Sequence, residues 1–208
     1  MDNVRMVIFD CDGVMFDSKG ANTAYYNDIL SHFNRPELTD KQLAYAHQHA
    51  VSAVLSYLFN DKEALGAAKA YQQEIDYRQF IRYMTMEPDL QDLLKWLKPK
   101  YMTAIATNRT YTMDWVLEAF DLGAYFDLVV CAGDVVHPKP EPDILLKILA
   151  DFRIQPHQAI YVGDSPVDES AAEAAGIPLV AFSNPSLNAP YHINRLKELR
   201  SILKNRHF

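Results

Sequence analysis

The sequence has little cysteine, no excess of positive charge and no long apolar run, and each shortage excludes a class of protein. Its 20 Lys and Arg residues stand against 27 Asp and Glu, for a net charge of −7. That balance argues against the basic face that nucleic-acid binding requires. No apolar segment approaches the length that spans a bilayer, and the first residues resemble no signal peptide. The sequence therefore indicates neither a nucleic-acid-binding nor a membrane protein.

The two cysteines, Cys11 and Cys131, each follow an apolar, strand-like run. We expect them to be reduced, packed thiols in a cytoplasmic protein. A content of 49% hydrophobic and 23% charged residues is ordinary for a globular chain and excludes disorder. A chain of 208 residues can bury one core with a smaller appended lobe.

Short apolar runs predict strands, and helix-like segments separate the later ones. The runs cover residues 5–9, 102–107, 128–131, 159–162 and 179–182. This alternation predicts an α/β fold with a Rossmann-like, doubly wound parallel sheet covered on both faces. The gap between the first two runs is far longer than one crossover helix needs. We therefore predict a catalytic core of residues 1–18 and 85–208, interrupted by an inserted domain of residues 19–84.

The inserted segment has almost no strand character, and its apolar residues recur at helical spacing. Capping-box spacing marks two helix starts, Thr39 with Gln42 and Asn60 with Glu63. We therefore predict a small helical cap domain that stands over the sheet.

The first apolar run ends in two aspartates one residue apart, Asp10 and Asp12. Alternation along a strand sends residues i and i+2 to the same side, so both carboxylates should lie at the strand's carboxyl end. Two such carboxylates repel each other unless a cation lies between them, and Mg²⁺ takes hard oxygen ligands together with phosphate and water. The pair suggests metal-assisted phosphate chemistry.

Polar side chains also follow three later runs: Thr107, Asn108 and Arg109 after the second, Lys139 among prolines after the third, and Asp164 and Asp168 after the fourth. Each set has a plain structural explanation. Thr107 could cap a helix, Lys139 could be solvated, and the two aspartates could cap the next helix. Together they lie at the carboxyl ends of strands in one predicted parallel sheet, where ligands bind. The combination favours a functional site.

With these four motifs the sequence resembles the haloacid dehalogenase superfamily, in the branch that carries a helical cap after the first motif and includes phosphoglycolate phosphatases and sugar-phosphate mutases. The resemblance covers nearly the whole chain. It rests on Asp10-x-Asp12-Gly13-Val14 with Asp17-Ser18, Thr107-Asn108, Lys139-Pro140-x-Pro142 and Gly163-Asp164-Ser165-x-x-Asp168. It implies a Mg²⁺-dependent phosphatase that acts on a small phosphorylated metabolite.

The resemblance also implies the roles of the acidic residues. Asp10 would attack phosphorus and form an aspartyl-phosphate, and Asp12 would protonate the leaving oxygen and later take a proton from water. The metal would be held by Asp10, by the backbone carbonyl of Asp12 and by Asp164. Asp168 would orient metal-bound waters or Lys139 from outside the direct ligands of the metal.

The phosphoryl oxygens would be held by Thr107, by amides near Asn108 and by Lys139, where charge needs stabilisation. The position of Arg109 is often lysine in phosphoglycolate phosphatase-like relatives. We expect Arg109 to contact the phosphate or the substrate.

Substrate choice should come from the cap. His47 and His49 occupy about the position of the family's specificity loop and could meet a carboxylate or a sugar hydroxyl, or they could be two solvated surface histidines. Arg78 and Arg82 lie one helical turn apart and could clamp an anion, or they could belong to a charged helix face.

Two relatives within the superfamily are disfavoured. Dehalogenases lack an acid-base aspartate such as Asp12, and phosphonate-cleaving enzymes place a Schiff-base lysine in the cap, where this chain has none between Gln42 and Asp61. A phosphomutase, which uses the same core residues, stays open. So does a binding or regulatory protein on the same scaffold, although no catalytic residue is missing. The substrate and the choice between monomer and homodimer stay open as well.

Overall fold

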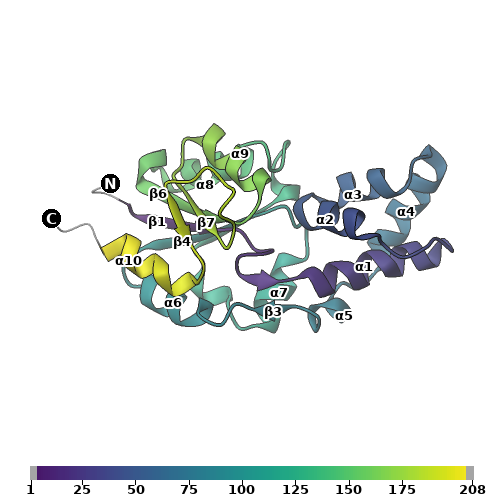
Figure 1. The fold of residues 1–208 in the computed structure, drawn as a ribbon, viewed down its shortest axis with the longest axis horizontal. Coiled ribbons are helices and arrows are strands. Elements are labelled where there is room, and N and C mark those ends of the chain that lie inside the picture. The colour runs from purple at the N-terminus through teal and green to yellow at the C-terminus, as the bar shows by residue number, and fades with distance from the viewer. Residues whose placement is uncertain (1–3, 205–208) are drawn as a thin grey trace.

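A parallel sheet of six strands, in the order β5-β4-β1-β6-β7-β8, forms the centre of the computed structural model, which describes residues 4–204 (Figure 1). Residues 1–3 and 205–208 of the predicted core lie outside the described residues. The strands are β1 (Met6–Phe9), β4 (Met102–Thr107), β5 (Leu128–Cys131), β6 (Ala159–Gly163), β7 (Leu179–Phe182) and β8 (Tyr191–Ile193). Five of them follow the predicted runs to within one residue, and β8 was not predicted. The predicted fold class is confirmed.

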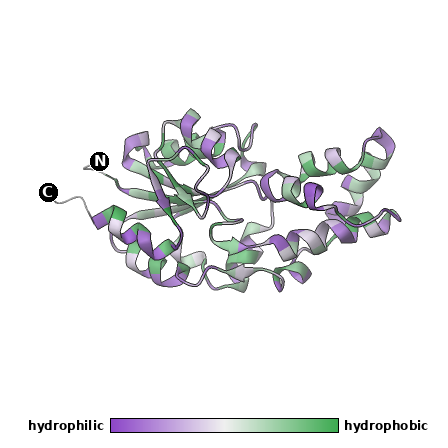
Figure 2. Ribbon diagram, in the orientation of Figure 1, coloured by the Kyte–Doolittle hydropathy of each residue, from purple (hydrophilic) through white to green (hydrophobic). Residues whose placement is uncertain are grey.

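Strand alternation divides the core into two layers, because successive side chains point to opposite faces of the sheet. Val7 and Phe9 of β1 belong to one apolar cluster, and Met6 and Ile8 to the other. The first cluster is covered by α6 (Leu90–Leu97), α7 (Met113–Ala119) and α10 (Leu199–Lys204), and the second by α8 (Asp143–Phe152) and α9 (Pro166–Ala175). Figure 2 shows strongly hydrophobic strands between helices of mixed hydropathy. Cys11 and Cys131 are buried and free, which confirms that both are packed thiols.

The inserted helices lie beyond one end of the sheet (Figure 1). They are α1 (Lys19–His32), α2 (Asp40–Gln48), α3 (Val51–Leu58), α4 (Lys62–Glu74) and α5 (Arg78–Ile81). A two-stranded antiparallel ribbon, β2 (Phe16–Asp17) with β3 (Thr85–Met86), pairs the chain that enters the insertion with the chain that leaves it. The helical cap is therefore attached at one place, at the carboxyl edge of the sheet.

One of the two predicted helix starts is confirmed and the other is wrong. Thr39 and Gln42 form a reciprocal capping box at α2. Helix α4 begins one residue later than expected, because Asp61, and not Asn60, is its N-cap and accepts a hydrogen bond from the amide of Ala64 at 2.7 Å. A carboxylate at this position also interacts favourably with the positive end of the helix dipole.

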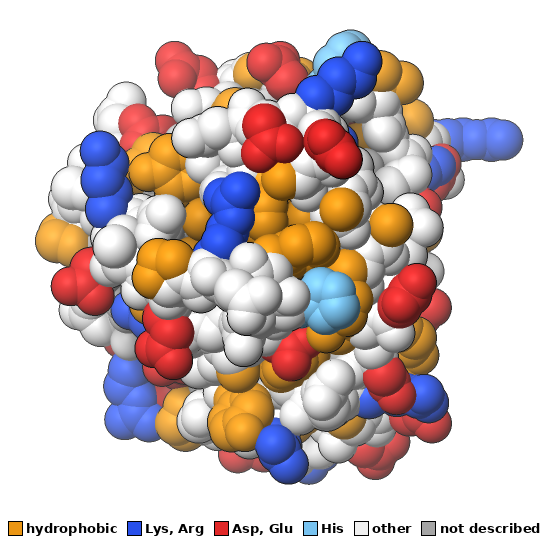
Figure 3. All heavy atoms as spheres, turned by 90° about the vertical axis from the view of Figure 1, so that its right-hand side faces the viewer, with side chains coloured by type: hydrophobic (Ala, Val, Ile, Leu, Met, Phe, Trp, Pro, Cys, Tyr) orange, Lys and Arg blue, Asp and Glu red, His pale blue; other side chains and the backbone are white. Residues whose placement is uncertain are grey.

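Figure 3 shows the end of the molecule formed by the helical cap. Charged side chains of both signs are dispersed across that face, with apolar side chains between them. Within residues 4–204, no helix is both long and apolar enough to cross a membrane.

Candidate active site

The site lies where β4, β1 and β6 end side by side. Because β1 pairs with β4 on one side and with β6 on the other, their carboxyl ends meet at one edge. Asp10 follows β1, Thr107 ends β4 and Asp164 follows β6, while Lys139 comes from the loop between β5 and α8. The structure thus brings all four predicted motifs to one place.

Lys139 is at the centre of a buried hydrogen-bond network. Its side chain is only 2% exposed, and its ammonium donates to Asp10 Oδ1 at 2.7 Å, to Asp168 Oδ1 at 2.7 Å and to the Tyr161 hydroxyl at 2.8 Å. Burial would lower the pKa of Lys139, but the two carboxylates raise it above its ordinary value. The alternative of a solvated lysine is wrong, because a buried charge needs partners and this one has two.

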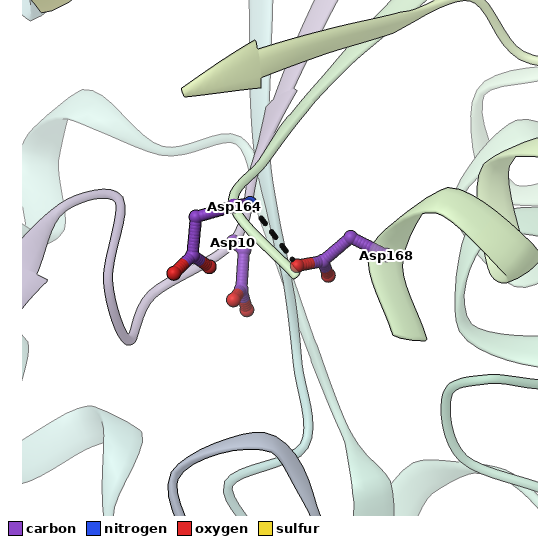
Figure 4. A group of neighbouring side chains, drawn as sticks. All are labelled: Asp10, Asp164 and Asp168. Carbon is purple, nitrogen blue, oxygen red and sulfur yellow. Dashed lines mark hydrogen bonds between the residues drawn. The ribbon is translucent and has the colours of Figure 1, made fainter. Parts of the chain in front are cut away.

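Asp10, Asp164 and Asp168 form a cluster in which one oxygen of each carboxylate lies within 4.8 Å of the others. Figure 4 shows Asp10 and Asp164 pointing the same way, with Asp168 approaching from the start of α9. Burial, together with the charge of Asp168, raises the pKa of Asp164 to about 7, and burial also raises that of Asp10 despite Lys139. Carboxylates this close together repel one another when ionised. A divalent cation would relieve that repulsion, so the cluster fits a Mg²⁺ site.

Asp168 also stabilises the start of helix α9. Its Oδ2 accepts hydrogen bonds from the Ser165 hydroxyl at 2.5 Å, the Ser165 amide at 3.1 Å and the Asp164 amide at 3.2 Å. Burial would raise the pKa of Asp168, yet Lys139 and these donors hold it below its ordinary value. The capping interpretation of Asp168 is therefore correct, and the same carboxylate contacts Lys139 with its other oxygen.

Two glycines give the acidic cluster its space. Gly13 has φ +86°, and a Cβ added there would collide with the carboxylate of Asp164. A Cβ at Gly163 would collide with the side chain of Asp168. Glycine is the residue that fits both the backbone conformation at position 13 and the close approach at both positions.

We expect Gly13→Ala to destabilise the protein by about 1–3 kcal/mol, through backbone strain and displacement of Asp164. Gly66→Ala is the matched control, because Gly66 lies inside α4 with no heavy atom near its would-be Cβ. That variant should be about 0.5–1 kcal/mol more stable than the wild type. Urea unfolding of both variants measures this difference, and equal stability would contradict the steric argument.

Arg109 makes a bidentate ion pair with Asp12. Its Nη2 and Nε donate to the two oxygens of Asp12 at 2.6 and 2.8 Å. Its Nη1 donates to the Tyr77 hydroxyl at 2.9 Å, which connects the core to the cap end at α5. Burial would raise the pKa of Asp12, and the guanidinium holds it below its ordinary value. Arg109 was expected to contact phosphate or substrate; in this structure it lies on the catalytic candidate Asp12.

Thr107 and Asn108 lie at the carboxyl end of β4. Thr107 is fully buried, and its Oγ1 accepts the amide of Arg109 at 3.1 Å. It caps no helix, because α7 begins only at Met113. Asn108 donates from Nδ2 to the carbonyl oxygens of Lys139 at 2.9 Å and Gln48 at 3.4 Å. Its Oδ1 is buried without a hydrogen-bond partner in the described structure.

A cavity of about 110 Å³ lies between the core motifs and the cap. His47 and His49 both line it, so the alternative of two solvated surface histidines does not hold. Asn22 Nδ2 lies 3.0 Å from His47 Nδ1, and His49 Nδ1 lies 2.9 Å from the carbonyl of Tyr45. Burial lowers the pKa of His47.

The structure leaves Arg78 and Arg82 outside this cavity. They line a separate surface groove, and Arg78 is paired with Asp76 at 2.8 Å. The alternative of a charged helix face therefore describes them.

Sequence reasoning missed several residues that belong to the site. They are Tyr161 below Lys139, and Asn22, Tyr25, Tyr26, Tyr77 and Tyr111 around the cavity. One signal was available in the sequence: Asn22 and Tyr26 lie four residues apart and therefore share a face of α1.

Comparison with known proteins gives a consistent result. Residues 7–182 match the family described as haloacid dehalogenase-like hydrolase. A phosphoglycolate phosphatase of Shigella boydii is 30% identical over 88% of this chain and 82% of its own length. A phosphorylated carbohydrates phosphatase of Thermotoga maritima is 26% identical, with 89% and 88% covered. A crystal structure of a HAD-superfamily hydrolase of subfamily IA from Geobacter sulfurreducens is 40% identical over 96% of each chain, with a TM-score of 0.78.

Proposed function

Since the chain belongs to the haloacid dehalogenase-like hydrolases and resembles relatives that are phosphatases, we propose that it is a Mg²⁺-dependent phosphatase of a small phosphorylated metabolite. The reaction would pass through an aspartyl-phosphate on Asp10. One observation carries the proposal: Asp10, Asp164 and Asp168 lie close together (Figure 4), and Lys139 pairs with Asp10 and Asp168 beside a cavity between the core motifs and the cap.

Asp10 is the proposed nucleophile. Lys139 binds its Oδ1, and no described residue donates a hydrogen bond to its Oδ2, which leaves that oxygen available to phosphorus. In the first step the Asp10 oxygen–phosphorus bond forms and the bond from phosphorus to the leaving oxygen breaks. In the second step water attacks phosphorus, and Asp10 is released as a carboxylate.

Asp12 is the proposed acid and base. The leaving oxygen takes a proton from Asp12 in the first step, and Asp12 takes one from the attacking water in the second. The ion pair with Arg109 favours the anionic form, which the second step requires. The first step requires one of the two hydrogen bonds to Arg109 to open, so that this oxygen of Asp12 can carry the proton.

The non-bridging phosphoryl oxygens have three proposed donors: the Thr107 hydroxyl, the backbone amide of Asn108 and the Lys139 ammonium. Thr107 Oγ1 accepts the Arg109 amide, so its own proton is free for the ligand. All three N–H bonds of Lys139 are in use, and the neutral Tyr161 is the partner that a phosphoryl oxygen would replace at least cost.

Mg²⁺ would be held by Asp10, Asp164 and the backbone carbonyl of Asp12, with Asp168 behind them. When bound, the cation supplies charge stabilisation to the phosphoryl group and lowers the repulsion between Asp10 and an anionic ester. The two free, buried thiols fit a reducing compartment, and we place the protein in the cytoplasm.

The test is phosphate release from a panel of phosphorylated metabolites, with Mg²⁺ and with a chelator. We expect Asp10→Asn to lower turnover by at least about a thousandfold without unfolding the protein, because the amide is not a nucleophile. Asp151→Asn, at an exposed position on α8, is the isosteric control and should retain activity. Full activity of Asp10→Asn would refute the proposal. Capture of the phosphoryl group by a sugar phosphate in place of water would show a mutase.

A further inference from the structure

Neutral amide and phenol side chains form much of the cavity wall, together with His47 and His49. The amide and phenol residues are Asn22, Tyr25, Tyr26, Gln48, Tyr77 and Tyr111. The ring of Tyr25 packs against those of Tyr26 and Tyr77 at centroid distances of 5.0 and 5.3 Å. These edge-to-face contacts hold the wall in one arrangement. A leaving group attached to a phosphate at Asp10 would lie against this wall.

The two strong cations that line the cavity have no free donor. Arg109 uses its five N–H bonds on Asp12 twice, on the hydroxyls of Tyr77 and Thr112, and on the sulfur of Met84. Lys139 uses all three on Asp10, Asp168 and Tyr161. Both cations are also balanced by carboxylates, and Lys139 is already a proposed donor to the phosphoryl group, so a carboxylate on the leaving group gains little further attraction from either of them.

His47 is not a cation in this arrangement. Its Nδ1 lies 3.0 Å from Asn22 Nδ2, and with the Asn22 amide in this orientation Nδ1 accepts the hydrogen bond and carries no proton. The lowered pKa of His47 agrees with this neutral form. The histidine offers a ligand one neutral N–H at Nε2.

Two polar groups of residues that line the cavity have no hydrogen-bond partner among the described residues, and an alcohol can serve both, since it donates as well as accepts. The Oδ1 of Asn108 is a buried acceptor without a donor within residues 4–204. The nitrogen of this amide is fixed by two carbonyl acceptors, so the assignment of oxygen and nitrogen is secure. The hydroxyl of Tyr26 makes no hydrogen bond to another described residue, although the residue is only 4% exposed. A carboxylate has no proton to donate to Asn108, whereas an alcohol has one.

We propose that the leaving group of the substrate is a short neutral polyol or sugar, and that this phenol and amide wall excludes carboxylic acids. The inference rests on the proposed phosphatase function and names its substrate class. Aromatic edges with a few fixed polar groups suit C–H and O–H groups of such a ligand. The cavity has a volume of about 110 Å³. A single water needs roughly 10–15 Å³ by the same measure, so the cavity suits a short leaving group.

The test compares phosphate esters that differ only in a terminal CH₂OH or carboxylate. The pairs are glycerol 3-phosphate with 3-phosphoglycerate, and 2-hydroxyethyl phosphate with 2-phosphoglycolate, each with the full-length enzyme and Mg²⁺. We expect kcat/KM for the alcohol to exceed that for the acid by at least about tenfold, because polar groups left unpaired penalise the wrong ligand strongly. A preference for either acid overturns the inference.

A separate assay distinguishes this failure from failure of the proposed function. If the wild type hydrolyses p-nitrophenyl phosphate in an Asp10-dependent manner but prefers the acids, only the substrate class is wrong. If it hydrolyses no ester at all, the phosphatase proposal fails, and this inference fails with it.

Variants then test whether the phenol and amide side chains of the cavity wall recognise the alcohol. Tyr26→Phe keeps the ring and should lower kcat/KM for the alcohol esters about threefold to tenfold, mostly through KM, whereas Tyr57→Phe, at an exposed position of the cap, should leave it unchanged. An unchanged kcat/KM for the alcohol esters in Tyr26→Phe overturns the assignment. So does an acid preference that disappears in Arg109→Lys, because it would show that Arg109 leaves Asp12 to bind a substrate carboxylate.

Discussion

Lys139→Met is expected to lower the free energy of unfolding of the metal-free protein by about 3–5 kcal/mol, the cost of removing one partner from a buried ion pair. The ammonium lies 2.7 Å from both Asp10 and Asp168, and all three side chains are buried. Without Lys139 these carboxylates lose their positive partner in a region of low dielectric constant. Phosphate release should fall as well, because an anionic ester would then meet the acidic cluster without the ammonium.

Chemical unfolding measures this loss, and its dependence on pH identifies the cause. The loss should shrink at acid pH, where the unpaired carboxylates take up protons. Lys147→Met is the control, since its pair with Asp151 is exposed at 3.4 Å and should contribute less than about 0.5 kcal/mol. A Lys139 variant as stable as the control would mean that Asp10 and Asp168 are not both ionised in the folded protein.

The positions of the core motifs could be predicted because the information is local. An apolar run that ends in Asp10 or in Asp164 indicates both the strand and the residue at its carboxyl end. Parallel pairing of β4, β1 and β6 then brings those ends together without further information. The same reasoning could not decide whether Lys139 was solvated, because its burial depends on the side chains of three other elements.

Partner choice inside the site was not predictable from spacing. Arg109 pairs with Asp12, which lies 97 positions earlier, and its remaining bonds reach Tyr77 of the cap end. Tyr161 occupies the middle of an apolar strand, where an aromatic residue indicates only packing, yet its hydroxyl reaches Lys139. The start of α4 shows that even local sequence signals have a limit. Asn60 and Asp61 are both residue types that cap helices, and only the backbone geometry decides between them.

The contribution of Asp164 makes the stability of the metal-free protein depend on pH in an unusual direction. Its pKa in the folded protein is about 7, against an ordinary value of 3.8, chiefly because of burial and the charge of Asp168. The folded state therefore favours the protonated form, and this stabilisation is complete below about pH 4 and is lost as the pH rises to about 7. Asp10, whose pKa is also raised, acts in the same direction. Asp12 and Asp168 have lowered pKa values, so their stabilisation is lost only at more acidic pH.

Mg²⁺ should reverse this trend, because it binds the ionised carboxylates. At about one hundred times Kd it should add about 2.7 kcal/mol and raise the unfolding temperature by roughly 5–10 °C at pH 8, and by much less at pH 5. Asp164→Asn should be more stable than the wild type at pH 8 without metal, should lose part of the pH slope, and should gain little from Mg²⁺. Thermal unfolding with and without Mg²⁺ measures all three effects, with Asp151→Asn as the control. A metal-free stability of the wild type that rises between pH 4 and 7 would contradict the raised pKa of Asp164. An Asp164→Asn variant that Mg²⁺ stabilises as strongly as the wild type would separate Asp164 from the metal site and leave its raised pKa to burial and the charge of Asp168.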